Sequence, residues 1–394
     1  MASALIKINP ATATASLLIL YPPLFSVLIK LVGVPLPSYV LVLAMSFLLL
    51  AAGLNIPSVR RHGSGVGRIY LAYFVMCLVS LAYTPADFAA EQKLGYMGYV
   101  LLFPLACIMV SVGMQRGSAA HYYEKLEASL VRHVFFCAAL FTVLFFLFRY
   151  EESAGRYILP GIANPIWVSR YFGLLLIGLV YAFFKAGSRQ HRNLAAGFGI
   201  VVLGGLFLSG SKTPFFAVFI VISLMLYSRN VSVMRLMKIA AFGALVLLPL
   251  VYFGSGSYIL ETEFFSMVYR LEAVGHVFES QRFWLGNGIA SYGPIIFNDD
   301  VEAYPHNLYL EAFFELGIVG LGLMLLLTAK LVRSYDARLI DFFALYFWVN
   351  ANMSGDVPGN AMFFTVAFVA VMTGQAKRSA GQPKRILNVI EKLP

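Results

Sequence analysis

Runs of about twenty apolar residues alternate with shorter polar connections along nearly the whole chain. A helix of that length crosses a hydrocarbon core of about 30 Å. The pattern therefore predicts an all-α polytopic membrane protein with about twelve transmembrane helices, which forms a single integral membrane domain over residues 1–394. The predicted spans lie near residues 12–32, 35–53, 68–84, 95–114, 130–149, 166–185, 194–209, 213–228, 236–254, 307–329, 338–352 and 359–376.

The composition supports this fold class. The chain is 60% hydrophobic and only 12% charged, whereas soluble proteins carry about 25% charged residues. The formal net charge of +10 is no sign of nucleic-acid binding, because membrane proteins concentrate Lys and Arg in their cytoplasmic loops.

The charges of the connections alternate and so predict their sides. One set is basic and the alternate set is acidic or mixed, which places both termini in the cytoplasm. The basic set holds Arg60, Arg61 and Arg68; Arg116, Lys125 and Arg132; Lys185, Arg189 and Arg192; Arg229, Arg235 and Lys238; Lys330, Arg333 and Arg338; and a cytoplasmic tail, 377–394, with Lys377, Arg378, Lys384 and Arg385. The alternate set holds Asp87 and Glu91, Glu151 and Glu152, the segment 255–306, and Asp356.

The segment 255–306 is a long outer, periplasmic loop between predicted spans nine and ten. Its apolar residues recur at three- and four-residue steps, which is the spacing of one helical face. This predicts an amphipathic helix near 258–280 that lies along the outer membrane surface or over a cavity. The stripe consists of Leu260, Phe264, Met267, Leu271, Val274 and Phe278.

Several kinds of chemistry find little support. Cys77, Cys107 and Cys137 each fall within a separate apolar run, so we interpret them as small core residues. The chain has no HExxH, CxxC, GxSxG or P-loop motif. The acidic stretch 299–302 could bind a divalent ion, but such loops are more often simply solvated. We expect no metal site and no cofactor.

Basic residues on the predicted outer side contradict the usual charge bias and so need a reason. Each one taken alone could snorkel or pair with a nearby glutamate. As a set that converges from separate loops they predict an anion site, because guanidinium groups bind phosphate oxygens bidentately. The set consists of Arg149, Arg156, Arg170, Lys212, Arg270 and Arg282.

His306 lies directly before the predicted tenth span, with Pro305 marking the helix boundary. An imidazole with a pKa near about 6.5 can accept a proton from a sugar hydroxyl. Asn307, Glu311 and Glu315 follow at four-residue steps and predict a polar stripe below the histidine. This stripe could orient the imidazole and pair with a buried arginine, and structural pairing is as consistent with the two glutamates as catalysis.

Three segments together resemble the bacterial O-antigen ligase family, within the O-antigen ligase and polymerase superfamily. "HNLYLEAFFELGIVGLGL" is similar to its His-Asn…Glu-x-Gly-x-x-Gly signature. We interpret the glycines of this stretch as sites of close helix packing. "YRLEAV" with "FWLGNGIASYG" resembles its Arg-plus-Gly-x-Gly stretch, and "GRYILPGIANPIWVSR" resembles its Gly-Arg…Asn segment. Lys212 stands where the family commonly has arginine, which weakens a bidentate role there. The matching residues are Gly155, Arg156, Asn164, Arg170, Arg270, Gly286, Gly288, His306, Asn307, Glu315, Gly317 and Gly320.

The resemblance implies a GT-C-like helical architecture and glycosyl transfer at the outer face of the bacterial inner membrane. The donor would be O-antigen polysaccharide on undecaprenyl pyrophosphate, the acceptor a sugar hydroxyl of lipid A–core, and the reaction metal-independent and inverting. His306 would be the general base, Arg270 would act in catalysis, and Arg156, Arg170, Lys212 and Arg282 would bind the pyrophosphate. Asn307, Glu311, Glu315, Gly286 and Gly288 would support the site.

Two alternatives stay open at this point. A polymerase of the same superfamily would join the same donor to another lipid-linked repeat, and these motifs do not separate the two. A secondary transporter would suit twelve spans with both termini inside, although the chain shows no internal repeat and carries a large outer loop.

Overall fold

The computed structural model describes residues 19–32, 64–94, 119–153, 156–160, 164–228, 268–280, 282–301, 303–355 and 358–379, together with residues 12, 16 and 97. The predicted spans at 35–53 and 236–254, and that at 95–114 except for Met97, lie outside these residues. The total of about twelve spans therefore stays a prediction.

The described chain is mostly helical. Its helices are α2 (Pro22–Val32), α5 (Ser64–Ser80), α7 (Ala119–Phe148), α8 (Pro165–Lys185), α9 (Arg189–Leu208), α10 (Lys212–Tyr227), α12 (Leu308–Ser334), α13 (Leu339–Ala351) and α14 (Ala361–Ser379). Residues 88–94 and 268–279 are also helical. A π-helical turn covers Gly293–Phe297 and a 3-10 turn covers Pro358–Asn360. A short hairpin, which the hydrophobic pattern did not predict, consists of β1 (Tyr150–Ser153) and β2 (Arg156–Ile158), and Tyr150 pairs with Ile158.

The helices confirm a multi-pass membrane protein. Segments Lys125–Phe148, Pro165–Lys185, Arg189–Leu208 and Leu308–Ser334 are long and apolar enough to cross a membrane. Shorter apolar helices cover Gly65–Ser80, Lys212–Tyr227, Leu339–Ala351 and Ala361–Gln375. Each of these eight lies within a few residues of a span predicted from the hydrophobic pattern, apart from α7, which begins earlier than expected.

Helix α8 forms the centre of the bundle. Within their most apolar stretches 78% of α8 but only 22% of α9 is buried, so α9 is peripheral. Glycines allow the neighbours of α8 to approach closely: a Cβ at Gly173 would lie 2.7 Å from the Tyr346 ring of α13. On the α7 side, a Cβ at Gly178 would lie 2.6 Å from Val134. Such contacts replace the hydrophobic effect as the source of helix association within lipid.

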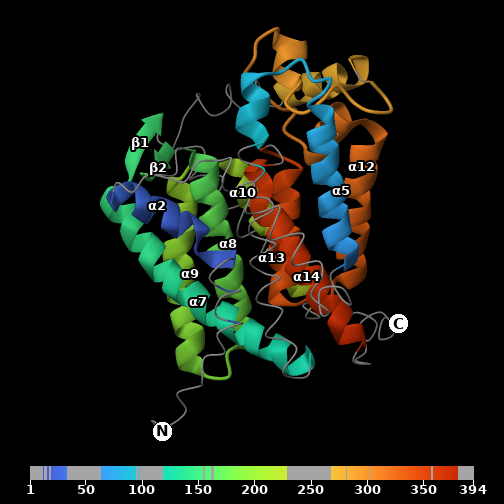
Figure 1. Ribbon diagram of the computed structural model, residues 1–394. Coiled ribbons are helices and arrows are strands. Elements are labelled where there is room, and N and C mark those ends of the chain that lie inside the picture. Colours follow the sequence, from blue (N-terminus) through green and yellow to red (C-terminus); the bar gives the residue numbers. More distant parts are fainter. Residues whose placement is uncertain are drawn as a thin grey trace.

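Helices α5 and α12 lie side by side on one flank of the bundle, as Figure 1 shows. The segment 268–305 gathers at the end of the bundle where α12 begins (Figure 1), and we call this end the loop end. The α12 helix runs from there to the opposite end, where Ser334 lies.

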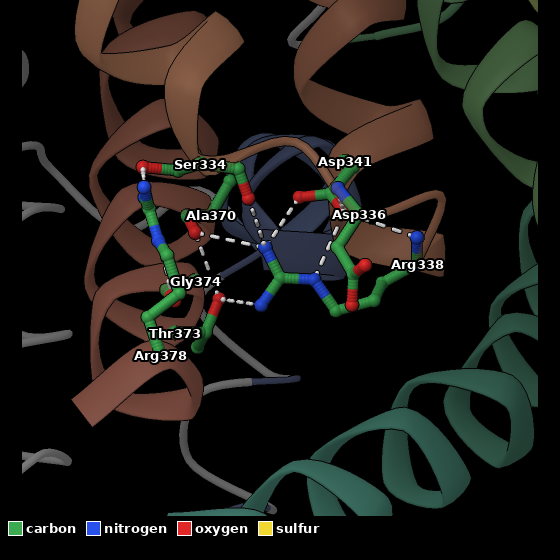
Figure 2. Close-up of polar contacts among 8 residues, drawn as sticks. All are labelled: Ser334, Asp336, Arg338, Asp341, Ala370, Thr373, Gly374 and Arg378. Carbon is green, nitrogen blue, oxygen red and sulfur yellow. Dashed lines mark hydrogen bonds and ion pairs between the residues drawn. The ribbon is translucent and has the colours of Figure 1, made fainter. Parts of the chain in front are cut away.

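At that opposite end, Arg338 joins α12, α13 and α14 (Figure 2). Its guanidinium forms a bidentate pair with Asp341, with Nε–Oδ2 2.9 Å and Nη2–Oδ1 2.6 Å. It also donates to the Ser334 and Ala370 carbonyls at 3.2 and 3.0 Å and to the Thr373 hydroxyl at 2.9 Å. Because every one of these groups is buried, the cluster fixes the relative positions of the three C-terminal helices.

Two of the three cysteines lie within the described residues. Cys77 of α5 and Cys137 of α7 are buried free thiols, which confirms that they are core residues. Cys107 lies outside the described part of the chain.

Candidate functional site

The helix entrance predicted at Asn307 is confirmed. The Asn307 side-chain oxygen accepts hydrogen bonds from the backbone N–H groups of Tyr309 and Leu310, at 3.0 and 3.1 Å. Asparagine is among the best N-cap residues because it satisfies donors that the helix itself leaves open. His306, directly before the cap, has φ +55°, a left-handed conformation that non-glycine residues adopt mainly where surrounding contacts hold them.

Two aromatic rings hold the His306 side chain. The centroids of Tyr304 and Tyr269 lie 4.8 and 5.6 Å from the imidazole centroid, both edge to face. Tyr269 belongs to the helical segment 268–279, so this segment lies against the entrance of α12. Burial raises the pKa of Tyr269. Arg270 is the next residue along the chain and is half-buried.

Arg170 lies inside the bundle and contacts backbone carbonyls. The guanidinium donates to Ser354 at 2.6 Å, to Gly359 at 3.2 Å and to Asn350 at 3.4 Å. It therefore anchors the connection between α13 and α14. Asn352 of that connection accepts a hydrogen bond from the Asn307 side chain at 3.1 Å. Arg170 is thus linked to the entrance of α12 through the 350–359 connection, while its expected role in binding pyrophosphate stays a prediction.

Glu311 and Glu315 both pair with Lys93. The Lys93 ammonium donates to Glu315 Oε1 at 2.6 Å and also to Glu311 Oε1. All three side chains are at most 3% exposed. Lys93 was not among the predicted site residues, and a buried arginine partner for these glutamates stays a prediction.

The Gly-x-Gly stretch packs on a kink in α12. Gly317 has φ +64° and ψ −157°, a backbone region open almost only to glycine. There the loop residues Asn287 and Gly288 donate backbone hydrogen bonds to the carbonyls of Phe314 and Glu315, both at 2.9 Å. A Cβ on Gly317 would collide with the Trp284 carbonyl. Gly317 therefore forms a kink, where we had expected only close packing between helices.

The same loop is fixed to the end of α5. Thr84 Oγ1 donates to the Ile289 carbonyl at 2.7 Å, and the Ser80 hydroxyl accepts from the Ile289 N–H at 3.0 Å. A Cβ on Gly288, which has φ +97°, would lie 2.5 Å from the Thr84 Cβ. Glu315 Oε1 also accepts from the Ala290 N–H at 3.0 Å. The loop end is thus one connected structure built from α5, the Gly-x-Gly loop and the first half of α12.

A comparison with known families finds a match that covers part of this structure. Residues 196–325 match the family model described as O-antigen ligase. This stretch is similar to O-antigen ligases. The match begins in α9 and ends in α12, so it includes the Gly-x-Gly loop, His306 and the kink at Gly317. No curated protein matches the chain.

Within the matched stretch, residues 268–279 form a helix where the amphipathic helix was predicted, and residues 255–267 lie outside the described chain. Ala273 and Val277 form its buried face, packed with the aromatic rings of Tyr292 and Phe314. The predicted stripe faces the other way: Leu271, Val274 and Phe278 are exposed. Whether this stripe lies along the membrane surface or over a cavity stays a prediction.

The acidic stretch at the end of the loop has a structural role. The Asp300 carboxylate accepts backbone hydrogen bonds from Asp87, Phe88 and Ala89, at 2.7 to 3.2 Å. It thereby caps the helical segment 88–94, which carries Lys93 at its other end. These backbone hydrogen bonds, first of all the one from Phe88, lower the pKa of Asp300. Among the described residues no group of three or more His, Cys, Asp or Glu side chains could hold a metal ion.

The other expected basic residues are spread over several elements. Lys212 is the first residue of α10 and is half-buried, and Arg282 is exposed at the start of the Gly-x-Gly loop. Arg156 is the first residue of β2. Its side chain and the whole of Gly155 lie outside the part of the chain that the structure describes. Asn164 caps α8 by accepting from the Ile166 N–H at 2.8 Å. The convergence of these cations on one anion stays a prediction.

Proposed function

We propose that the protein transfers O-antigen polysaccharide from undecaprenyl pyrophosphate to a sugar hydroxyl of lipid A–core. His306 takes the proton of the acceptor hydroxyl as that oxygen forms its bond to the anomeric carbon. The bond from this carbon to the pyrophosphate oxygen breaks, and the pyrophosphate leaves with the bonding electrons. Attack from the opposite side inverts the anomeric centre. No metal or other cofactor takes part in the proposal.

One observation carries this proposal. His306 stands at the entrance of α12 inside the matched O-antigen ligase stretch, in a left-handed conformation between the rings of Tyr304 and Tyr269. A general base must be held in place to act efficiently, because misplacement of reacting groups by about 1 Å can cost about 100-fold in rate. The fixed helix cap at Asn307 and the adjacent aromatic rings supply such a hold.

The proposed pyrophosphate site uses the basic residues of the loop end. Arg270 follows Tyr269, which contacts the imidazole, so we assign it to the leaving group. Arg156, Lys212 and Arg282 would neutralise the remaining charge. Arg170 would act together with them or through the connection that it anchors. This assignment places the loop end at the periplasmic face of a GT-C-like bundle in the inner membrane, with both termini in the cytoplasm.

The test is transfer by purified protein in lipid nanodiscs from an undecaprenyl-pyrophosphate-linked glycan to lipid A–core. Since general base catalysis contributes about 10²- to 10⁴-fold, His306→Ala should lower the rate by that factor. His191→Ala is the matched control, because His191 is exposed at the start of α9, outside the loop end. Full activity of folded His306→Ala protein would contradict the assignment of the base.

The same assay decides the reaction class. Product on lipid A–core with EDTA present supports a metal-independent ligase. Loss of transfer in EDTA, restored by a divalent ion, would contradict metal independence. A lengthened lipid-linked glycan without any lipid A–core conjugate would instead identify a polymerase.

A further inference from the structure

The turn that leads into the Gly-x-Gly loop exposes three large apolar side chains in a row. Phe283, Trp284 and Leu285 are 51%, 72% and 56% exposed. Exposed apolar residues are ordinary when they are scattered, but a contiguous patch marks a contact surface. Trp284 is notable among them because tryptophan combines an apolar ring system with an N–H donor.

The helical segment 268–279 extends this surface. Leu271 and Phe278 on its outward face are 62% and 65% exposed, and Val274 between them is also exposed. The Phe278 and Phe283 rings each lie 6.1 Å from the ring of Phe313, so they lie on the same side of α12. We call this surface the apolar ridge, which consists of Leu271, Val274, Phe278, Phe283, Trp284 and Leu285.

The apolar ridge continues the lipid-facing sides of two helices of the membrane bundle. The Ile318 N–H of α12 donates to the Phe283 carbonyl at 2.8 Å, and the next residue, Val319, is 42% exposed. On the α5 side, the Tyr83 hydroxyl donates to the Leu285 carbonyl at 2.7 Å. Val79, one turn earlier, is 54% exposed. The ridge thus begins where the exposed apolar sides of α5 and α12 end.

We propose that the apolar ridge is seated in the bilayer, in the interfacial layer of the leaflet on the loop side. An amphipathic segment with aromatic residues on its apolar face lies in this layer with its polar face toward water. Tryptophan is enriched at this depth, since its ring tolerates a boundary that is apolar below and wet above.

The apolar ridge is joined to the candidate site by a backbone hydrogen bond as well as by ring contacts. The Phe283 carbonyl contacts α12 directly after the kink, and Gly286 and Gly288 follow within the same turn of chain. The depth of the ridge therefore sets the height of the Gly-x-Gly loop above the membrane. This inference does not rest on the proposed reaction and would hold for any reaction at the loop end.

Tryptophan fluorescence tests the seat, because the chain contains only Trp167, Trp284 and Trp348. The W167F/W348F variant leaves Trp284 as the sole reporter, and it is reconstituted in vesicles of phospholipids brominated at either a shallow or a deep acyl position. We expect loss of most Trp284 emission with shallow bromines, a smaller loss with deep ones, and little quenching by iodide in the water phase. W284F/W348F, which reports on Trp167 beside Arg170 in α8, controls for quenching unrelated to the ridge.

Two results would overturn the proposal. Strong quenching by iodide together with emission unaffected by brominated lipids would place Trp284 in water. Iodide quenching that disappears only on adding a polyprenyl phosphate would assign the ridge to a polyprenyl chain instead of the bilayer. If the single-tryptophan variant does not fold, wild-type protein compared with W284F in the same lipids gives the Trp284 signal by difference.

Discussion

Lys93 is the buried cation that joins the helical segment 88–94 to α12 at the loop end. Its ammonium contacts two carboxylates of α12, and one of these, Glu315, also accepts the Ala290 N–H at 3.0 Å. Buried ions are costly to remove from water, and the cost is offset only while each one keeps its partner. Lys93 therefore holds the Gly-x-Gly loop and the first half of α12 together.

Replacing Lys93 by methionine should destabilise the fold by about 3–5 kcal/mol, because two carboxylates then lose their buried cation. Thermal unfolding in detergent or nanodiscs measures the loss. The matched control is Lys185→Met, which breaks the more exposed pair with Glu127 at 3.0 Å and should cost at most about 1 kcal/mol. The K93M/E311Q/E315Q variant should recover part of the lost stability. Equal effects of K93M and K185M would contradict the inferred role of Lys93.

Asn307 and Lys93 differ in how far their contacts could be predicted from the sequence. The cap at Asn307 is a local event, formed within three residues, and so it was predictable from Pro305 and the following apolar run. The Lys93–Glu311 contact joins residues 218 positions apart. No local pattern specifies such a partner, which is why the polar stripe was expected to meet an arginine.

At the scale of elements, the hydrophobic pattern located the described spans well and the special turns poorly. Span boundaries follow from apolar runs, and lipid requires helices there. The kink in α12 is different, because Gly317 lies in an apolar stretch that continues without interruption past it. Its conformation results from the approach of the Trp284 backbone, which the α12 sequence does not encode.

The helical segment 88–94 offers a test at this scale. Asp300→Ala removes the acceptor for the N–H groups of residues 87–89, so hydrogen–deuterium exchange at these amides should speed up. Asp299→Ala is the control, since the neighbouring side chain does not cap this helix. Unchanged exchange at residues 87–89 in Asp300→Ala would contradict the cap.

The cap also predicts a dependence on pH. Its backbone hydrogen bonds lower the folded-state pKa of Asp300 below the ordinary value of 3.8. The stabilisation is therefore complete above the unfolded-state pKa and is lost as the pH falls through the folded-state value. Asp300→Asn should abolish this part of the acid sensitivity.

For the whole molecule, α12 connects two polar clusters at opposite ends of the bundle. The first half of α12 carries the kink and the two glutamates that pair with Lys93. At the other end of α12, the carbonyl of its last residue, Ser334, accepts a hydrogen bond from Arg338 at 3.2 Å. Most of the α12 residues between them are apolar. The position of α12 along the bundle is thus determined at both ends, while the middle contributes shape and packing.

The Arg338 cluster gives a prediction for the bundle as a whole. Arg338→Lys keeps the charge but loses the planar fork that binds Asp341 bidentately and reaches α14 (Figure 2). We expect an earlier thermal transition, with a loss of about 2–4 kcal/mol, since several buried hydrogen bonds disappear. Arg333→Lys, at an exposed position one turn earlier, should leave the transition unchanged.

Because the cluster lies at the far end from His306, the Arg338→Lys protein that stays folded should retain its rate of glycosyl transfer. A normal transition temperature in Arg338→Lys would contradict the stabilising role of the cluster. A loss of rate without any change in stability would show that the two ends of α12 are not independent.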